Sequence, residues 1–300
     1  MNSTTLPDIT SNSQPITLTT LQWVGMENIA VPMKIKHLDQ SISNISTAVN
    51  VYVNLADPTA KGIHMSRLHL LLNQLEEKQI SKERLESLLS KFVESQDRKS
   101  QNSKIEISFD LILKKPSLLT NNWGFQSYPI KIHGEKRSNK YLFGFELCIP
   151  YSSTCPCSAS LSRDILKKEI QKKFTSERID RKEFLEWFET KNTLFATPHG
   201  QRSFVKLTLD IAQNTWPDIP TLIFQLEGAI GTPTQTVVKR KDEQEFAMLN
   251  AENLMFCEDA ARIVKKSLSQ MPFLDSYSFK VEHQESLHNH NAVVIEHSAQ

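Results

Sequence analysis

The sequence predicts an α+β protein made of two similar modules, with antiparallel sheets that carry helices on one face. Segments in which apolar and polar residues alternate predict strands, because successive strand side chains point to opposite faces. Segments with apolar residues three or four positions apart predict amphipathic helices. Each half of the 300 residues follows the order strand, strand, helix, helix, strand, strand.

The first half begins with a weak strand and a clear one. Ser81 is a suitable N-cap for its second helix, since a serine oxygen can accept a hydrogen bond from a free backbone N–H. The last strand is expected to end in a turn at Gly134. The predicted elements are strands over 29–35 and 47–55, helices over 65–75 and from Ser81 onward, and strands over 104–113 and 127–133.

The second half repeats this order around a charged, helix-prone insertion over 160–191. Its predicted elements are strands over 141–149 and 203–211, helices over 220–228 and within 243–269, and strands over 277–282 and 292–296. The expected organisation is a disordered tail over 1–18, a first module over 19–138 and a second over 139–300.

Composition excludes several classes of protein. A net charge of +1 is not expected of a protein that coats nucleic acid. We find no apolar run near the roughly 20 residues that span a bilayer. The polar start over 1–14 lacks the features of a secretory signal, which predicts a cytoplasmic protein. The four cysteines are therefore expected to be free thiols.

Two segments carry residues typical of metal or proton chemistry. Cys155 and Cys157 flank a proline in a Ser/Thr-rich loop, after a strand expected to end at Pro150. His288 and His290 lie two positions apart before the last strand, so on an extended chain both face the same way. Each segment alone is equally compatible with incidental loop residues.

Further charged residues fit an anion or ligand site. His199 begins a polar turn with Gln and Arg before a strand. Glu243 follows a short basic cluster at a helix start, and Glu258 lies among apolar neighbours in the next helix. The structural alternative for Glu258 is a salt bridge to Arg262 or Lys265. Lys61 and Arg67 lie at a helix start that is suited to phosphate, Arg202 adds an anion-binding group beside His199, and Lys239 and Arg240 form the basic cluster before Glu243.

These motifs together resemble GTP cyclohydrolase type IB. The resemblance covers about residues 23–294 and rests on seven motifs in the same order. They are GMEN at 25–28, KGIHMSR at 61–67, CPCS at 155–158, HGQRS at 199–203, KRKDE at 239–243, FCED at 256–259 and HNHN at 288–291.

The resemblance implies the tunnelling fold, with two ββααββ modules in each subunit. It also implies homo-oligomers, typically tetramers, with active sites between subunits. The family reaction converts GTP and water to formate and 7,8-dihydroneopterin triphosphate, the entry to folate and related pterins. A bound divalent metal, Mn²⁺ or Zn²⁺ with Fe²⁺ as a further candidate, activates the water that attacks guanine C8.

The resemblance also assigns roles to residues. Cys155 is expected to be a metal ligand and catalytic thiolate, with His199 and Glu243 as further ligands. His288 and His290 are expected to transfer protons, and His288 also to bind metal. Glu258 should hold guanine, because one carboxylate can accept from both N1–H and the 2-amino group. The five basic residues named above should bind the triphosphate.

The sequence departs from the family pattern at two places. Ala159 follows CPCS where many relatives have lysine, and HGQR replaces HNQR or HSQR. Neither change removes a chemical group from the expected site.

Two rival functions are compatible with parts of the sequence. One is that of the tunnelling-fold nitrile reductase, which uses a nucleophilic cysteine and NADPH without a metal. The other is a non-catalytic protein that binds purines or pterins.

Overall fold

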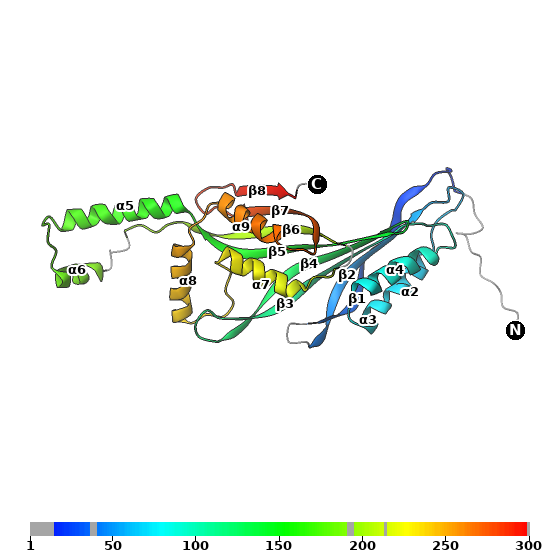
Figure 1. The fold of residues 1–300 in the computed structure, drawn as a ribbon, viewed down its shortest axis with the longest axis horizontal. Helices are drawn as coiled ribbons and strands as arrows, with labels where there is room; N and C mark the ends of the chain where they lie inside the picture. The colour runs from blue at the N-terminus through cyan, green and yellow to red at the C-terminus, as the bar shows by residue number, and fades with distance from the viewer. Residues whose placement is uncertain (1–14, 37–40, 191–194, 213–214, 299–300) are drawn as a thin grey trace.

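A single antiparallel sheet organises the computed structural model, which describes residues 15–36, 41–190, 195–212 and 215–298. Within these residues eight strands form one sheet in chain order, from β1 at one edge to β8 at the other (Figure 1). Helices are placed between the second and third strands of each half. The predicted α+β class and element order are therefore confirmed.

The first half follows the predicted order closely. The Ser81 hydroxyl caps α4 by accepting from the backbone N–H of Arg84 at 3.4 Å, as expected. The elements are β1 (Leu21–Lys36), β2 (Ile42–Leu55), α2 (Met65–Leu72), α3 (Gln74–Glu77), α4 (Lys82–Glu94), β3 (Ser103–Pro116) and β4 (Trp123–Arg137).

The second half contains the predicted insertion as two helices. Figure 1 shows α5 and α6 projecting from the body of the molecule. The elements are β5 (Lys140–Thr154), α5 (Pro156–Lys173), α6 (Arg181–Phe188), β6 (Gly200–Ile211), α7 (Ile219–Ile230), α8 (Arg240–Glu252), α9 (Cys257–Ser269), β7 (Leu274–His283) and β8 (Ala292–His297). No helix of the described residues is long and apolar enough to cross a membrane.

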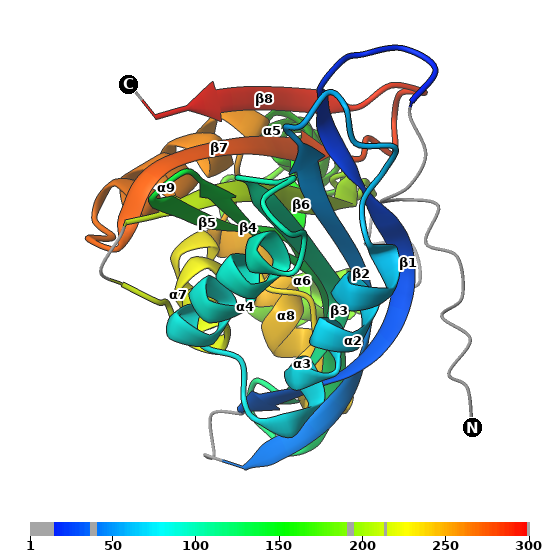
Figure 2. The same ribbon diagram turned by 90° about the vertical axis from the view of Figure 1, so that its right-hand side faces the viewer.

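One face of the sheet carries the core and the helices. Alternate residues of each central strand are buried, for example Val49, Val51 and Val53 on β2. The helices cover this face: α4 contacts β3 and β4, α7 contacts β5, and α9 contacts β7 and β8. Figure 2 shows the same arrangement of helices and sheet in a view along the longest axis of the molecule. Burial of this apolar face is the main term that stabilises the fold.

The predicted turn at Gly134 is wrong. Gly134 lies inside β4 and pairs with Ile105 on β3 and Phe143 on β5. A Cβ at this position would lie 2.9 Å from the Phe143 ring, so glycine serves a close approach between strands and not a turn. The chain turns later, at Ser138, which has a φ of +53°.

The proposed division at residues 138 and 139 falls in this turn. The strands on either side, β4 and β5, are hydrogen-bonded neighbours, so both predicted modules contribute to one sheet. The division into modules stays a prediction. The expected disordered tail over 1–18 lies largely outside the described residues.

A buried ion pair joins the two halves. The Lys115 ammonium on β3 lies 2.8 Å from both carboxylate oxygens of Glu227 on α7. Tyr128 on β4 donates to the same carboxylate at 2.6 Å. Lys115 also donates to Gln126 and to the carbonyl of Thr234. Burial, followed by the contact with Glu227, raises the pKa of Tyr128.

We predict that this ion pair is essential to stability. Glu227→Gln would leave the Lys115 charge buried without its partner, which typically costs about 3–5 kcal/mol. Thermal unfolding should show a large fall in midpoint, whereas Glu296→Gln, in an exposed pair with Lys265, should change it little. A double change of Lys115→Met and Glu227→Leu should cost less than Glu227→Gln alone. Equal midpoints for Glu227→Gln and Glu296→Gln would contradict this prediction.

Candidate active site

The predicted chemical motifs meet at one row of strand ends in β5 to β8, an edge of the sheet that runs across its strands. Thr154, the last residue of β5, pairs with Gly200, the first of β6. Ser203 pairs with His283, the last residue of β7, and His283 pairs with Ala292, the first of β8. The CPCS, HGQRS and HNHN segments therefore lie side by side, because in an antiparallel sheet the end of one strand lies beside the start of the next.

The CPC segment begins a helix, so its predicted placement in a loop is wrong. The strand β5 continues past Pro150 to Thr154 because it stays paired with β6. Cys155 is the N-cap of α5, and Pro156 takes the first helical position, where its missing N–H is not needed. Cys155 is half-buried and Cys157 is exposed, and both are free thiols. The other two cysteines are free as well, as predicted.

His199 lies directly beside Cys155. The backbone N–H of Cys155 donates to the carbonyl of His199 at 3.3 Å. The backbone N–H of His199 donates to the Ser158 hydroxyl at 3.0 Å. The ring Nδ1 of His199 is 3.1 Å from Gln201 Oε1 and 3.8 Å from Glu285 Oε2. The structure thus brings the backbones of two predicted metal ligands together and holds His199 through several contacts.

The start of α9 is tied to the same edge. The backbone N–H of Met255 donates to the carbonyl of Thr154 at 3.2 Å. Glu258 follows in the first helical turn and is exposed. Burial, with added effects of the charges on Glu258 and Glu285, raises the pKa of Cys257 to about 11.

The structural alternative for Glu258 is wrong. Arg262 pairs with Asp259 at 2.7 Å, and Lys265 pairs with Glu296 at 3.1 Å. Glu258 forms no hydrogen bond or ion pair through its side chain with any residue that the structure describes. Its carboxylate is therefore available to a ligand.

Glu243 lies across a small pocket from the histidine turn. The pocket is lined by Gln201, Arg202 and Glu243 together with Thr236 and Phe246. Glu243 is exposed in the first turn of α8.

The neighbouring Asp242 fixes the start of α8. It accepts from the backbone N–H groups of Leu119 and Thr120 at 2.8 and 3.0 Å and from that of Lys239 at 2.8 Å. Burial alone would raise the pKa of Asp242, but hydrogen bonds from Thr120 and Lys239 hold that pKa well below its usual range.

The rings of the two C-terminal histidines stack on each other. His288 and His290 lie in the loop between β7 and β8, with ring centroids 4.9 Å apart and planes within 8°. Both side chains are exposed.

The basic residues are divided between two regions. Arg202 lies in the pocket with Glu243, and Lys239 and Arg240 are exposed at the start of α8. Lys61 and Arg67 belong to the region around α2, which lies far from α8 in the same chain (Figure 1). Arg67 also donates to the Ser95 carbonyl and pairs with Asp97 at 2.6 Å. One chain therefore does not bring all five together.

The predicted metal ligands have suitable chemistry but do not form a closed cluster. No group of three His, Cys, Asp or Glu side chains among the described residues is arranged to hold a metal ion. Cys155 and His199 are adjacent, and Glu243 lines the neighbouring pocket. A thiolate, an imidazole and a carboxylate form a donor set that fits Zn²⁺ or Mn²⁺. The residues present therefore fit a divalent metal by type.

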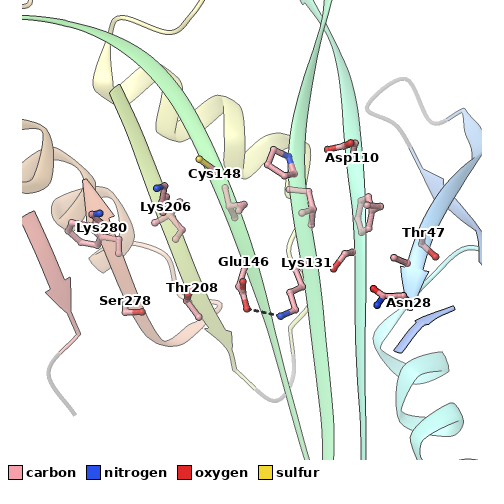
Figure 3. A pocket seen from close by; sticks show the side chains of 18 of the residues that line it. Asn28, Thr47, Asp110, Lys131, Glu146, Cys148, Lys206, Thr208, Ser278 and Lys280 are labelled. Carbon is pink, nitrogen blue, oxygen red and sulfur yellow. Dashed lines mark ion pairs between the residues drawn. The ribbon is translucent and has the colours of Figure 1, made fainter. Parts of the chain in front are cut away.

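A separate pocket on the helix-free face does not contain the predicted site residues (Figure 3). Its lysines are already paired. Lys131 lies 3.5 Å from Glu146, and both Lys206 and Lys280 contact Glu282, at 3.2 and 2.8 Å. Each lysine of this pocket thus already contacts a carboxylate, and Lys206 and Lys280 share one.

Sequence reasoning did not identify three residues that the structure places at the site. Gln201 and Glu285 contact the His199 ring, and Ser158 holds its backbone. Gln201 lies inside the HGQRS motif and Ser158 inside the CPCS motif, so the sequence did point to both residues. No sequence pattern pointed to Glu285, because only the pairing of β6 with β7 brings its loop to His199.

The comparisons with known proteins agree with this assembly of motifs. A model of the family described as type I GTP cyclohydrolase folE2 matches residues 6–294. The protein named GTP cyclohydrolase FolE2 from Hahella chejuensis is 52% identical over 97% of this chain and 95% of its own. Proteins of that name from Pseudoalteromonas atlantica and Citrobacter koseri are 46% and 44% identical, each over 97% of this chain and over 96% and 97% of their own. The chain belongs to the type I GTP cyclohydrolase FolE2 family.

Among solved structures, uricase from Arthrobacter globiformis matches with a TM-score of 0.48 and 8% identity, over 92% of this chain and 93% of its own. A uricase from Bacillus fastidious matches with a TM-score of 0.45 and 8% identity, over 92% of each chain.

We predict that Asp242 makes stability depend on pH. Because its pKa is lowered in the folded protein, its contribution is present above the unfolded value of 3.8 and is lost as pH falls below it. Asp242→Asn should lower the unfolding midpoint at pH 7, and the difference from wild type should shrink between pH 4 and pH 2. Asp164→Asn, in an exposed pair on α5, is the control. A difference that stays constant over this pH range would argue against the prediction.

Proposed function

We propose that this protein is a metal-dependent GTP cyclohydrolase, which converts GTP and water to formate and 7,8-dihydroneopterin triphosphate. This reaction is the first step of folate and related pterin synthesis. The family match over residues 6–294 is the observation that carries the proposal. It is supported by the sheet edge at which Cys155, His199, Glu258 and the loop of His288 emerge together.

The metal site is proposed to use Cys155, His199 and Glu243, with His288 as a further ligand. When bound, Mn²⁺, Zn²⁺ or Fe²⁺ would supply a Lewis acid that activates water. Cys155 and His199 lie where β5 ends and β6 begins, on backbone that pairing holds in place. Glu243 stands on a helix whose start is fixed by Asp242. The chain thus presents its donors on ordered elements.

Guanine recognition is proposed for Glu258. Its carboxylate has no partner among the described residues and lies in the first turn of α9. The two oxygens can accept from guanine N1–H and the 2-amino group at once, which is a bidentate, base-specific contact. Backbone N–H groups at the start of a helix favour a negative charge there. Glu258 would orient C8 of the base toward the metal site.

Proton transfer is proposed for His288 and His290. An imidazole can both accept and donate a proton near neutral pH. Their exposed, stacked rings occupy the loop that leads from β7 to β8. Cys155 is proposed as the catalytic thiolate as well as a metal ligand.

Triphosphate binding supports a further proposal about assembly. Arg202 lines the pocket of Glu243, and Lys239 and Arg240 lie at the start of the helix that carries Glu243, whereas Lys61 and Arg67 lie near α2 in the other half of the chain. If all five contact one triphosphate, the last two must come from another subunit. We therefore propose a cytoplasmic homo-oligomer, a tetramer by family resemblance, with sites between subunits.

The activity test uses metal-stripped protein with GTP, followed by addition of Mn²⁺ or Zn²⁺. We expect metal-dependent formate release and, after oxidation, neopterin fluorescence. Cys155→Ala should abolish ring opening in folded protein, while Cys148→Ala, on the helix-free face, should keep it. NADPH-dependent nitrile reduction without metal would support the rival enzyme instead. Binding of GTP or a pterin without turnover would support the non-catalytic rival.

We predict that Glu258→Gln weakens use of GTP. Loss of hydrogen bonds to a charged group costs about 2–3 kcal/mol, or roughly 30–150-fold in kcat/KM. Glu252→Gln, an exposed change at the end of α8, should leave kcat/KM unchanged. Steady-state kinetics with saturating metal measures both. Wild-type kcat/KM in Glu258→Gln would remove this residue from guanine recognition.

A further inference from the structure

We infer that Gln201 and Glu285 are positioning residues, which orient the His199 ring so that its Nε2 is the nitrogen presented to the metal. This inference rests on the proposed function, because it concerns the same metal site. It adds two residues that act on the metal site through the His199 ring.

The three side chains form a short chain of polar contacts. The Gln201 amide nitrogen lies 3.3 Å from Glu285 Oε1, and Gln201 Oε1 lies 3.1 Å from His199 Nδ1. Glu285 Oε2 is also 3.8 Å from the same Nδ1. The side chains of His199 and Glu285 are only 21% and 15% exposed. Water is therefore a limited competitor for these contacts.

The direction of the hydrogen bonds follows from what each group can do. An ionised carboxylate only accepts, so the end of Gln201 that faces Glu285 must be the NH₂ group. Its other end, the amide oxygen, then faces His199 and can only accept. Nδ1 of His199 must therefore carry the hydrogen. In a neutral imidazole this leaves the lone pair on Nε2, which is the state that binds a metal.

Backbone hydrogen bonds hold His199 and the loop of Glu285 in place as well. The carbonyl of His199 accepts from Cys155, and its N–H donates to Ser158. On the other side, the N–H of Gln284 donates to the carbonyl of Arg202 at 3.2 Å, which fixes the start of the Glu285 loop on β6. Rotation of the ring is thus limited by the side chains, and its place is set by the backbone.

Such outer contacts normally change metal affinity without abolishing binding. Partners of a ligating histidine fix its tautomer and orientation, and their loss typically lowers metal affinity by about 10–100-fold. Removal of the ligand itself has a larger effect. The order of effects therefore separates a positioning role from direct ligation.

The experiment measures Mn²⁺ dissociation constants of full-length metal-stripped protein, without nucleotide, from the electron paramagnetic resonance signal of free Mn²⁺. The variants are Gln201→Leu, Glu285→Leu, Glu285→Gln and His199→Ala. Gln284→Leu is the matched control, because Gln284 is exposed in the same loop and contacts Glu282. Circular dichroism and size-exclusion chromatography verify that each variant is folded and assembled.

We expect Gln201→Leu and Glu285→Leu to weaken Mn²⁺ binding by about 10–100-fold. Glu285→Gln should recover part of this loss, since its amide oxygen can still accept from Gln201 but no longer enforces the direction. His199→Ala should weaken binding most, and Gln284→Leu should match wild type. Absorption spectra with Co²⁺ should change in band position for Gln201→Leu, because the ligand geometry changes.

Two results would overturn the inference, and they can be told apart. If His199→Ala weakens Mn²⁺ binding while Gln201→Leu and Glu285→Leu bind as wild type, the positioning role fails and the proposed metal site stands. If wild-type protein binds neither Mn²⁺ nor Zn²⁺, the proposed function and the inference fail together.

Discussion

The buried ion pair between Lys115 and Glu227 is the interaction on which the arrangement of the site depends. A charge in the protein interior is strongly unfavourable unless a partner lies in the right place. Lys115 on β3 therefore fixes α7 through Glu227. It also donates a hydrogen bond to the Thr234 carbonyl, which holds the segment that follows α7 in place.

That segment leads directly into the site. Thr232 bonds to Ser152 of β5 through both its side chain and its carbonyl, near the end of the strand that delivers Cys155. The chain then reaches α8, where Asp242 is held by the loop between β3 and β4. Elements from the first half thus help to place Glu243, although all the predicted ligands, Glu243 included, belong to the second half. Strand register completes the arrangement, since a slip of one residue would turn each strand's apolar side chains to the wrong face.

Most of the fold could be predicted from the sequence because its signals are local. Alternation along β3 and β5 and the serine cap of α4 each depend on a few neighbouring residues. The errors arose where pairing between distant segments decides the outcome. Pro150 and Gly134 both favour a strand end by local rules. Gly134 nevertheless lies inside β4, paired with β3 and β5, and Pro150 lies inside β5, paired with β6. Glu285 reaches His199 only because β7 pairs with β6, which no local pattern reveals.

The candidate site was predicted residue by residue from motif order, and its spatial grouping is explained by the sheet. Cys155, His199 and the His288 loop share one edge, while Glu258 is brought there by the bond between Met255 and Thr154. Lys61 and Arg67 do not join them within one chain, which is a consequence of their place beside α2. The tautomer of His199 is a property of the three-residue contact and has no counterpart in sequence.

The most direct measurement is an anomalous difference map from crystals of this protein grown with Mn²⁺. The account predicts one strong Mn²⁺ peak per chain at the β5–β6 edge, bonded to Cys155 Sγ, His199 Nε2 and a Glu243 oxygen. A peak bonded to His199 through Nδ1, or a metal held only by residues away from this edge, would contradict it.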